Sequence, residues 1–455
     1  MPVNPARFSY LRPSLVAVSC ALLAFPATAQ RVAPDSVPKI GSAERAAIVR
    51  AISADIEEIY VFPELAVRMV AHLKERLDSG GYERFDDLFA FTAELTSDLR
   101  SISHDRHLGV LPLPPGGVGM AGGAGPIGGA DSAEGQRRRR ERLRRANYGF
   151  ERLEILEGNV GYLDLRQFAD ASIAGPTAIA AMNFLAGTDA VIVDLRQNGG
   201  GSPSMIQLLS SYFFEEPVHL NSFYLRREDR TDQFWSHAHV EGPRLVQTPL
   251  YILTSGYSFS AAEEFSYNMR HLERATLVGE TTGGGAHPSE MLDYPELGVH
   301  LSVPFGRAVN PITGTNWEGT GVEPHVRVPA AQALATAHRK ALEEIAAGAE
   351  EERRRELAWT IEGLGAEAVE LAAPELAAYV GTYGPRNVRV EGGRLVYQRQ
   401  AGPIFALVPV GDDRFHLAND NAFRIRFERD SGGRVVTLVG RYQDGREEPS
   451  PRTGG

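Results

Sequence analysis

The chain has 455 residues, of which 43% are hydrophobic and 23% are charged, and its formal net charge is −11. This length exceeds that of one ordinary domain, and the apolar fraction excludes a wholly disordered chain. The negative charge argues against nucleic-acid binding as the main function.

Residues 1–29 have the pattern of a secretory signal peptide. Arg7 and Arg12 precede a short apolar stretch over residues 14–25, and the segment ends in Ala27-Thr28-Ala29. The stretch is too short to span a bilayer, and no later segment is long and apolar enough to do so. We therefore predict an exported protein, secreted or periplasmic, with no membrane span. The single cysteine lies in this leader, so we expect no disulfide and no thiolate metal site in the mature chain.

Residues 30–112 are predicted to form a helical module. Apolar residues recur there at three- and four-residue spacing, which is typical of amphipathic helices. Gly80-Gly81 separates the second helix from a third, expected over residues 85–99.

A linker is predicted over residues 113–147. Its first part is rich in glycine and proline, and an arginine-rich run follows from Arg137 to Arg145. We interpret the arginines as a solvated loop or helix face rather than as a site for an anionic surface.

Residues 148–330 alternate between predicted strands and helices, which indicates an α/β domain with a largely parallel sheet. The expected strands are residues 160–165, 190–195, 250–253 and 276–279. One long helix is predicted over residues 330–357, within a helical linker that spans residues 331–372. From residue 373 to residue 455 short strands alternate with glycine, asparagine and aspartate turns, which predicts a small all-β domain.

The segment from Tyr251 to Phe265 is the most informative in the chain. A buried strand ends in a Gly/Ser turn, and a helix then begins at Ser260. Helix N-terminal amides favour developing negative charge, which makes Ser260 a candidate nucleophile for acyl transfer. The spacing Ser260-x-x-Glu263 also matches a capping box, in which the serine only closes the helix end. The two roles are compatible, and this segment alone leaves both open.

Backbone amides near this serine are candidates for an oxyanion hole. The glycine turn after the strand at residues 190–195 offers Gly199 and Gly200, and the helix offers Ala261. The base and acid are sought among histidines and loop carboxylates. The candidate histidines are His104, His107, His271 and His287, and the candidate acid is Glu318.

Several motifs, in order and at fitting separations, resemble those of the tail-specific (C-terminal processing) serine proteases. They are residues 194–200, 260–263, 279–284 and 317–324. The segments Tyr60-Val61-Phe62-Pro63 and Asp105-Arg106-His107-Leu108 resemble the branch that contains interphotoreceptor retinoid-binding-protein-like and tricorn-core members.

The resemblance implies a crotonase-like (ClpP/crotonase) α/β core with Ser260 as the nucleophile, His107 as the base and Glu318 as the acid. Many members pair the serine with a lysine twenty-five residues later, where this chain has Gly285. Tricorn-type members have an assisting serine before the histidine, where this chain has Arg106. No PDZ-like insert is evident, and the resemblance implies no metal and no organic cofactor.

We therefore predict a serine endopeptidase that acts on protein or peptide substrates. The retinoid-binding relatives offer an alternative, an apolar-ligand binder without peptidase activity, and an esterase with the same triad is a third hypothesis. The sequence does not fix the oligomeric state or the substrate preference.

Overall fold

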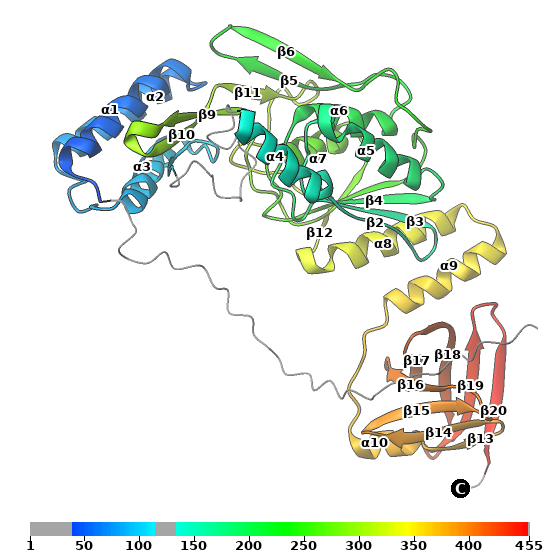
Figure 1. Cartoon of the computed structure of the whole chain (residues 1–455). Coiled ribbons are helices and arrows are strands. Elements are labelled where there is room, and N and C mark those ends of the chain that lie inside the picture. The colour runs from blue at the N-terminus through cyan, green and yellow to red at the C-terminus, as the bar shows by residue number, and fades with distance from the viewer. Residues whose placement is uncertain (1–38, 114–132, 454–455) are drawn as a thin grey trace, which may run out of the picture.

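The structure is a computed structural model that describes residues 39–113 and 133–453. The predicted signal peptide and most of the glycine-rich part of the predicted linker lie outside these residues. Three groups of elements follow one another along the chain: N-terminal helices, a mixed α/β core and a C-terminal barrel (Figure 1). No helix in the described ranges combines the length and the apolar character needed to cross a bilayer.

A six-stranded sheet lies at the centre of the core, in the order β12-β8-β7-β4-β3-β2. β2 is antiparallel to β3, and every other neighbouring pair is parallel. Because parallel strands end at the same edge, the loops after β4 and β7 meet there. The strands are β2 (Phe150–Leu156), β3 (Val160–Leu165), β4 (Ala190–Asp194), β7 (Leu250–Thr254), β8 (Thr276–Gly279) and β12 (Val326–Arg327).

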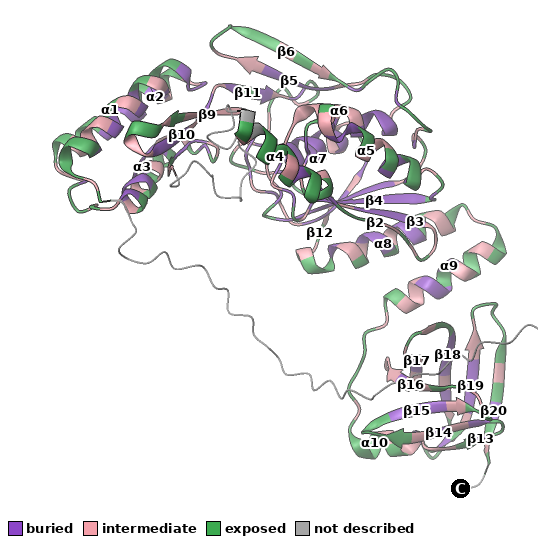
Figure 2. Ribbon diagram, in the orientation of Figure 1, coloured by how far each residue is buried: buried purple, intermediate pink, exposed green. Residues whose placement is uncertain are grey.

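Helices cover both faces of this sheet, so every residue of β4 and β7 is buried (Figure 2). One face packs against α5 (Ala171–Leu185), α6 (Pro203–Ser210) and α7 (Ala261–His271). The other face packs against the alanine-rich side of α8 (Ala330–Ala347). Burial on both faces explains the near-continuous apolar runs of these strands.

The single helix predicted over residues 330–357 is wrong. The structure has two helices there, α8 and α9 (Glu351–Leu364), and Gly348 follows the last residue of α8. Glycine is a poor helix former and a common helix terminator, which accounts for the break.

Two antiparallel sheets of three strands flank the core and were not predicted. The first has the order β1-β10-β9 and the second β11-β5-β6. Their strands are β1 (Gly109–Pro112), β5 (His219–Leu225), β6 (Arg230–Trp235), β9 (Ser289–Tyr294), β10 (Val299–Pro304) and β11 (Gly306–Val309).

The N-terminal helices pack against the first of these sheets. They are α1 (Ser42–Ile59), α2 (Pro63–Asp78) and α3 (Leu88–Ser103), drawn in blue in Figure 1. Their apolar faces share one buried cluster with Val299, Leu301 and Val303 of β10. β1 pairs with β10, so the segment after α3 is fixed to the core.

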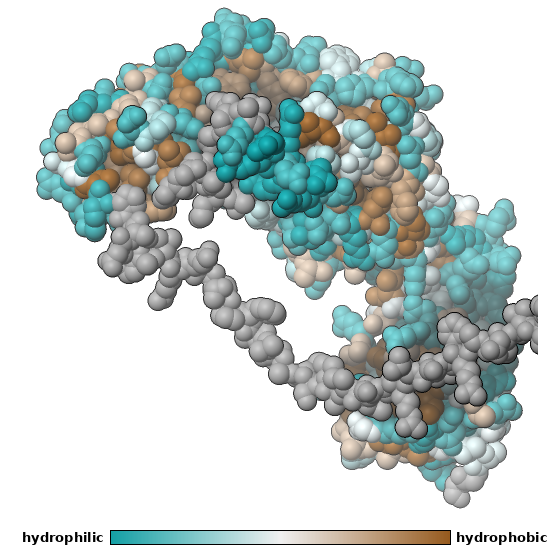
Figure 3. Space-filling model, in the orientation of Figure 1, coloured by the Kyte–Doolittle hydropathy of each residue, from teal (hydrophilic) through white to brown (hydrophobic). Residues whose placement is uncertain are grey.

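The arginine-rich run forms α4 (Ala133–Arg145) rather than a continuous linker. Arg137, Arg139 and Arg142 are exposed, and the helix is a strongly hydrophilic patch on the surface (Figure 3). Leu143 is buried and attaches the helix to the molecule. The prediction of a solvated helix face agrees with this exposure. Four short helices complete the described helical elements: η2 (Asn147–Gly149), η3 (Ser211–Phe213), η4 (Pro295–Leu297) and α10 (Ala373–Tyr379).

Eight antiparallel strands close into a barrel after α10. An aromatic cluster that includes Tyr383, Phe415 and Phe427 is buried in it. The strands are β13 (Gly381–Tyr383), β14 (Arg386–Glu391), β15 (Arg394–Arg399), β16 (Ile404–Pro409), β17 (Arg414–Leu417), β18 (Asp420–Arg429), β19 (Val435–Tyr442) and β20 (Glu447–Thr453).

Candidate active site

Ser260 lies in the turn between β7 and α7, and its backbone is strained. Its φ is 55° and its ψ is −119°, a sparsely populated region for a residue with a side chain. Such a conformation costs about 1–3 kcal/mol and is typical of functional sites. The Ser260 N–H donates to Glu263 Oε2 at 2.8 Å, but the Ser260 side chain makes no capping hydrogen bond. The capping box is thus half-formed, and the hydroxyl is left available.

The buried carboxylate of Glu263 holds this turn against the glycine loop after β8. Besides the Ser260 amide, it accepts hydrogen bonds from the amides of Gly284 at 2.6 Å and Gly285 at 2.8 Å. The Thr282 hydroxyl donates to it at 2.5 Å. Burial raises the pKa of Glu263, although these hydrogen bonds oppose the rise. Glu263 therefore fixes the backbone of Ser260.

The loop after β4 is held rigidly beside Ser260. The buried Asn198 side chain donates to Leu165 O at 2.8 Å and accepts from the Gly200 N–H at 2.8 Å, while Asn198 O accepts from the Phe259 N–H at 3.1 Å. In the described part of the chain the amides of Gly199 and Ala261 have no acceptor. The prediction for Gly200 therefore needs correction, because its N–H is already engaged and only Gly199 and Ala261 offer free amides.

His107 follows α3 in a turn that is anchored at several points. His104 ends α3 in the left-handed conformation, and Arg100 donates to Arg106 O and Leu108 O, each at 2.7 Å. The His107 ring packs on Phe259, the residue before Ser260, with 4.7 Å between ring centroids. Burial lowers the pKa of His107 to about 4, and its Nδ1 is buried without a hydrogen-bond partner.

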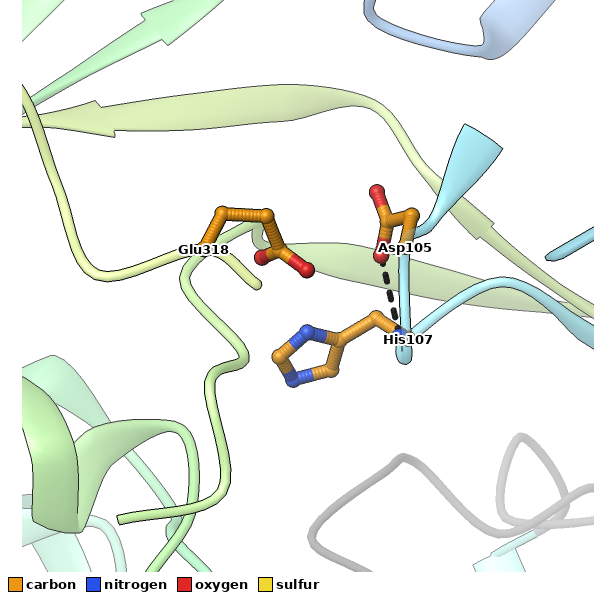
Figure 4. Close-up of side chains that lie close together, drawn as sticks. All are labelled: Asp105, His107 and Glu318. Atoms are coloured by element: carbon orange, nitrogen blue, oxygen red, sulfur yellow. Dashed lines mark hydrogen bonds between the residues drawn. The ribbon is translucent and has the colours of Figure 1, made fainter. Parts of the chain in front are cut away.

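Glu318 lies between β11 and β12, in a loop held by its neighbours. Trp317 is buried and donates from Nε1 to Gly285 O at 2.8 Å. Glu318 Oε2 accepts from the Ala286 N–H at 2.5 Å, whereas Oε1 is buried without a partner. Burial raises the pKa of Glu318 to about 7, and the charge of Asp105 adds to the rise. The Glu318 carboxylate and the His107 ring point toward one another (Figure 4).

Asp105 and His287 form a buried hydrogen-bonded pair beside His107 and Glu318. Sequence reasoning did not predict this pair. His287 Nδ1 lies 2.6 Å from Asp105 Oδ2 and 3.6 Å from Glu318 Oε2. Asp105 Oδ1 also accepts the His107 N–H at 2.9 Å. Asp105 belongs to the same sequence motif as His107. No spacing rule connects Asp105 to His287, which lies 182 positions away. Of the candidate histidines, His107 and His287 therefore meet near Glu318.

The other two candidate histidines lie elsewhere. His104 serves as the C-cap of α3, and His271 is the last residue of α7, where its ring packs on Tyr267. His271 is thus at the opposite end of α7 from Ser260.

Acidic and imidazole groups gathered in this way are the types that bind divalent cations. One ligand atom each of Asp105, His107 and Glu318 lie within 4.8 Å of one another. The His287 imidazole already lies between the two carboxylates, and although burial works to lower its pKa, their charges raise it. This arrangement suits a proton-transfer site better than a metal centre.

At Gly285 and Arg106 this chain differs from the family that it resembles, and the structure shows what each residue contacts. A Cβ on Gly285 would lie 2.1 Å from Phe259 Cζ and 2.8 Å from His107 Cε1, so His107 and Phe259 fill the space of a side chain at this position. The Arg106 guanidinium donates to Gly283 O and lies over the Phe259 ring. Arg106 thus holds the glycine loop and does not replace a hydroxyl.

Comparison with known proteins gives two family matches. Residues 159–328 match peptidase family S41, and residues 40–117 match the N-terminal domain of peptidase S41 in eukaryotic IRBP. The first match contains Ser260 and Glu318, and the second contains His107.

Three solved structures also match parts of this chain, each with a TM-score below 0.5. A Bacteroides fragilis structure assigned to the S41 proteases has 22% identity and a TM-score of 0.36, over 40% of this chain and 51% of that one. The photosystem II D1 C-terminal processing protease has 14% identity and a TM-score of 0.40, over 63% and 94%. The tricorn protease has 13% identity and a TM-score of 0.39, over 71% and 37%. This chain thus spans only about half of the first structure.

Proposed function

We propose that this chain, whose residues 159–328 match peptidase family S41, is a serine endopeptidase with Ser260 as its nucleophile. The strained backbone of Ser260 carries the proposal. In this conformation the Ser260 hydroxyl makes no hydrogen bond to the helix end, and it lies beside the free amides of Gly199 and Ala261. A serine that only capped the helix would accept a hydrogen bond from a helix amide through its hydroxyl, and that role does not need a strained backbone.

His107 is proposed as the base. Its ring contacts Phe259, which supports proton transfer from the adjacent Ser260. A base with a pKa of about 4 takes a proton poorly at neutral pH. An ionised Glu318 at His107 Nδ1 would correct this, because a neighbouring anion favours the protonated imidazole. Hydrogen bonds at active sites are often long until the substrate binds, which agrees with the unpaired Nδ1 and Oε1 atoms.

In the proposed reaction Ser260 Oγ attacks the scissile carbonyl carbon while its proton passes to His107. The resulting oxyanion is bound by the amides of Gly199 and Ala261. The C–N bond then breaks, the proton moves from His107 to the leaving amine, and an acyl-enzyme remains on Ser260. Water hydrolyses this ester with His107 again acting as the base.

Labelling with a fluorophosphonate probe tests the assignment of the nucleophile. We expect labelling of the wild type and none of Ser260→Ala or His107→Ala. Ser266→Ala is the matched control, because Ser266 lies in the same helix and its buried hydroxyl only donates to Ala262 O. A folded wild type that is not labelled would overturn the proposal in favour of an apolar-ligand binder. A labelled protein that cleaves esters but no peptides would favour an esterase.

The domain architecture and the location are also proposals. We propose that residues 148–330 form a crotonase-like catalytic core and that residues 373–455 fold as a separate domain, which the closed β13–β20 barrel supports. We further propose export through residues 1–29. N-terminal sequencing of the exported protein should begin at Gln30, and recovery of an intact leader in the cytoplasm would contradict export.

A further inference from the structure

The Asp105 carboxylate connects the segment that carries the proposed base, His107, to His287. Asp105 lies between α3 and β1 and is fully buried, and His287 comes from the segment before β9. Oδ1 of Asp105 accepts the amide of His107, and Oδ2 is shared by His287 Nδ1 and the Tyr60 hydroxyl, at 2.6 Å and 3.3 Å. One carboxylate therefore fixes the backbone of His107 relative to His287.

His287 also contacts Glu318, through both its ring and its backbone. Its Nδ1 lies 3.6 Å from Glu318 Oε2, and its backbone N–H donates to the same oxygen at 3.3 Å. The ring edge packs on Phe62, with 5.5 Å between centroids. An imidazolium at this place would lie between the buried carboxylate of Asp105 and the partly buried carboxylate of Glu318.

The charges around His287 favour its protonated form. Burial works to lower its pKa, but the hydrogen bond and charge of Asp105 and the charge of Glu318 raise it, against a smaller opposing effect of Arg307. Burial works to raise the pKa of Asp105, yet its contact with His287 keeps that pKa below the ordinary value. The titratable groups around Glu318 are Tyr60, Asp105, His107 and His287.

We propose that Asp105 and His287 form a positioning pair that holds Glu318 ionised and aligned with His107. This inference rests on the proposed function, because it assigns the pair a task in the same proton transfer. The His287 imidazolium is the cation in contact with Glu318, so it favours the carboxylate form that His107 needs. Asp105 keeps that imidazolium charged and anchors the His107 backbone.

The pair is tested by the rate at which the fluorophosphonate probe labels the protein, measured as a function of pH. The variants are His287→Gln and Asp105→Asn, each of which removes one charge and retains polar side-chain atoms. His287→Gln should lower the labelling rate at pH 7 at least tenfold and move the acid limb of the rate profile upward by at least half a pH unit. Asp105→Asn should lower the rate at least tenfold with a smaller movement of the acid limb, because the Asp105 charge, which this variant lacks, itself raises the pKa of Glu318. For peptide cleavage we expect the loss in kcat rather than in KM.

His300→Gln is the matched control. His300 is buried like His287, and its Nδ1 lies 2.5 Å from Asp293 Oδ1 on the β9–β10 hairpin. We expect this variant to lose thermal stability without any movement of the rate profile. If His287→Gln lowers the rate equally at every pH, the pair is only a structural contact and the proposal is wrong.

NMR titration of the histidine rings in Ser260→Ala separates this inference from the proposed function. The His287 ring should titrate above the ordinary imidazole pKa, and addition of Asp105→Asn should lower that pKa. This result does not depend on catalysis, so it stands even if the wild type is never labelled. A His287 ring that is neutral at pH 7 would overturn the positioning pair whatever the activity.

Discussion

A ring nitrogen of His107 lies within 4.8 Å of a carboxylate oxygen of Glu318, and each residue keeps one buried atom without a partner, Nδ1 and Oε1 respectively. A buried polar atom without a hydrogen bond lowers the stability of the fold. Because His107 Nδ1 and Glu318 Oε1 face one another, we infer that they form a hydrogen bond in another state of the site. His107 and Glu318 lie in different parts of the chain, and the pairing of β1 with β10 brings those parts together.

Glu318→Gln should lower kcat by about 10²- to 10⁴-fold, because an amide cannot stabilise a charged His107 as a carboxylate does. The variant should fold normally, since glutamine is isosteric with the protonated acid. Steady-state peptide cleavage is the measurement. Loss below threefold would exclude Glu318 as the partner of the base.

Activity and stability should respond to pH in opposite directions around Glu318. Its folded-state pKa is about 7 and the ordinary value is 4.5. Its contribution to stability is therefore fully present below about pH 4.5 and is lost as the pH rises through about 7. Activity should rise over the same interval, because the ionised form is the active one.

Unfolding free energies of the wild type and Glu318→Gln between pH 4 and pH 8 test the stability half of this prediction. The variant, which cannot ionise at this position, should lose less stability across the interval than the wild type. Parallel curves for the two proteins would contradict a raised pKa at Glu318.

Glu263→Gln should destabilise the protein by about 1–3 kcal/mol and reduce activity. The glutamine NH2 group would face backbone N–H donors that bind a carboxylate oxygen in the wild type. Glu264→Gln is the control, since burial raises the pKa of Glu264 to about 7 and glutamine mimics its neutral form. Thermal unfolding and probe labelling of both variants provide the measurement. Equal effects of the two substitutions would argue against a special role for Glu263 in holding Ser260.

Gly285→Ala should displace Phe259 and His107, because the added Cβ would lie 2.1 Å from Phe259 Cζ. Overpacking of this kind costs about 1–3 kcal/mol, and the moved base should lower the labelling rate. At Gly256, in the turn before Ser260, an added Cβ has no neighbour within 4 Å. Gly256→Ala should therefore leave stability and labelling unchanged, and an equally harmless Gly285→Ala would contradict the packing argument.

Four strands of the central sheet, β3, β4, β7 and β8, were predictable because they are largely buried, whereas β2 and β12 were not predicted. The run at residues 190–195 is apolar almost throughout, and the structure has β4 at Ala190–Asp194. The strand β6, Arg230–Trp235, was missed because it is polar and largely exposed, so its sequence lacks the alternation that marks a half-buried strand.

The site was only partly predictable, because its members are distant in the sequence. The strand–turn–helix pattern around Ser260 was visible locally, and the roles of His107 and Glu318 came from the family resemblance. The Asp105–His287 contact depends on the β1–β10 pairing, which brings together residues 182 positions apart. Spacing in one sequence does not report such a pairing.

Cleavage of an unfolded protein by the wild type and by Ser260→Ala, with the products identified by mass spectrometry, tests the central claim most directly. We predict internal cleavages by the wild type, loss of at least 10³-fold in Ser260→Ala, and normal cleavage by the Ser266→Ala control. Equal cleavage by wild type and Ser260→Ala, with both proteins folded, would contradict the assignment of Ser260 as the nucleophile.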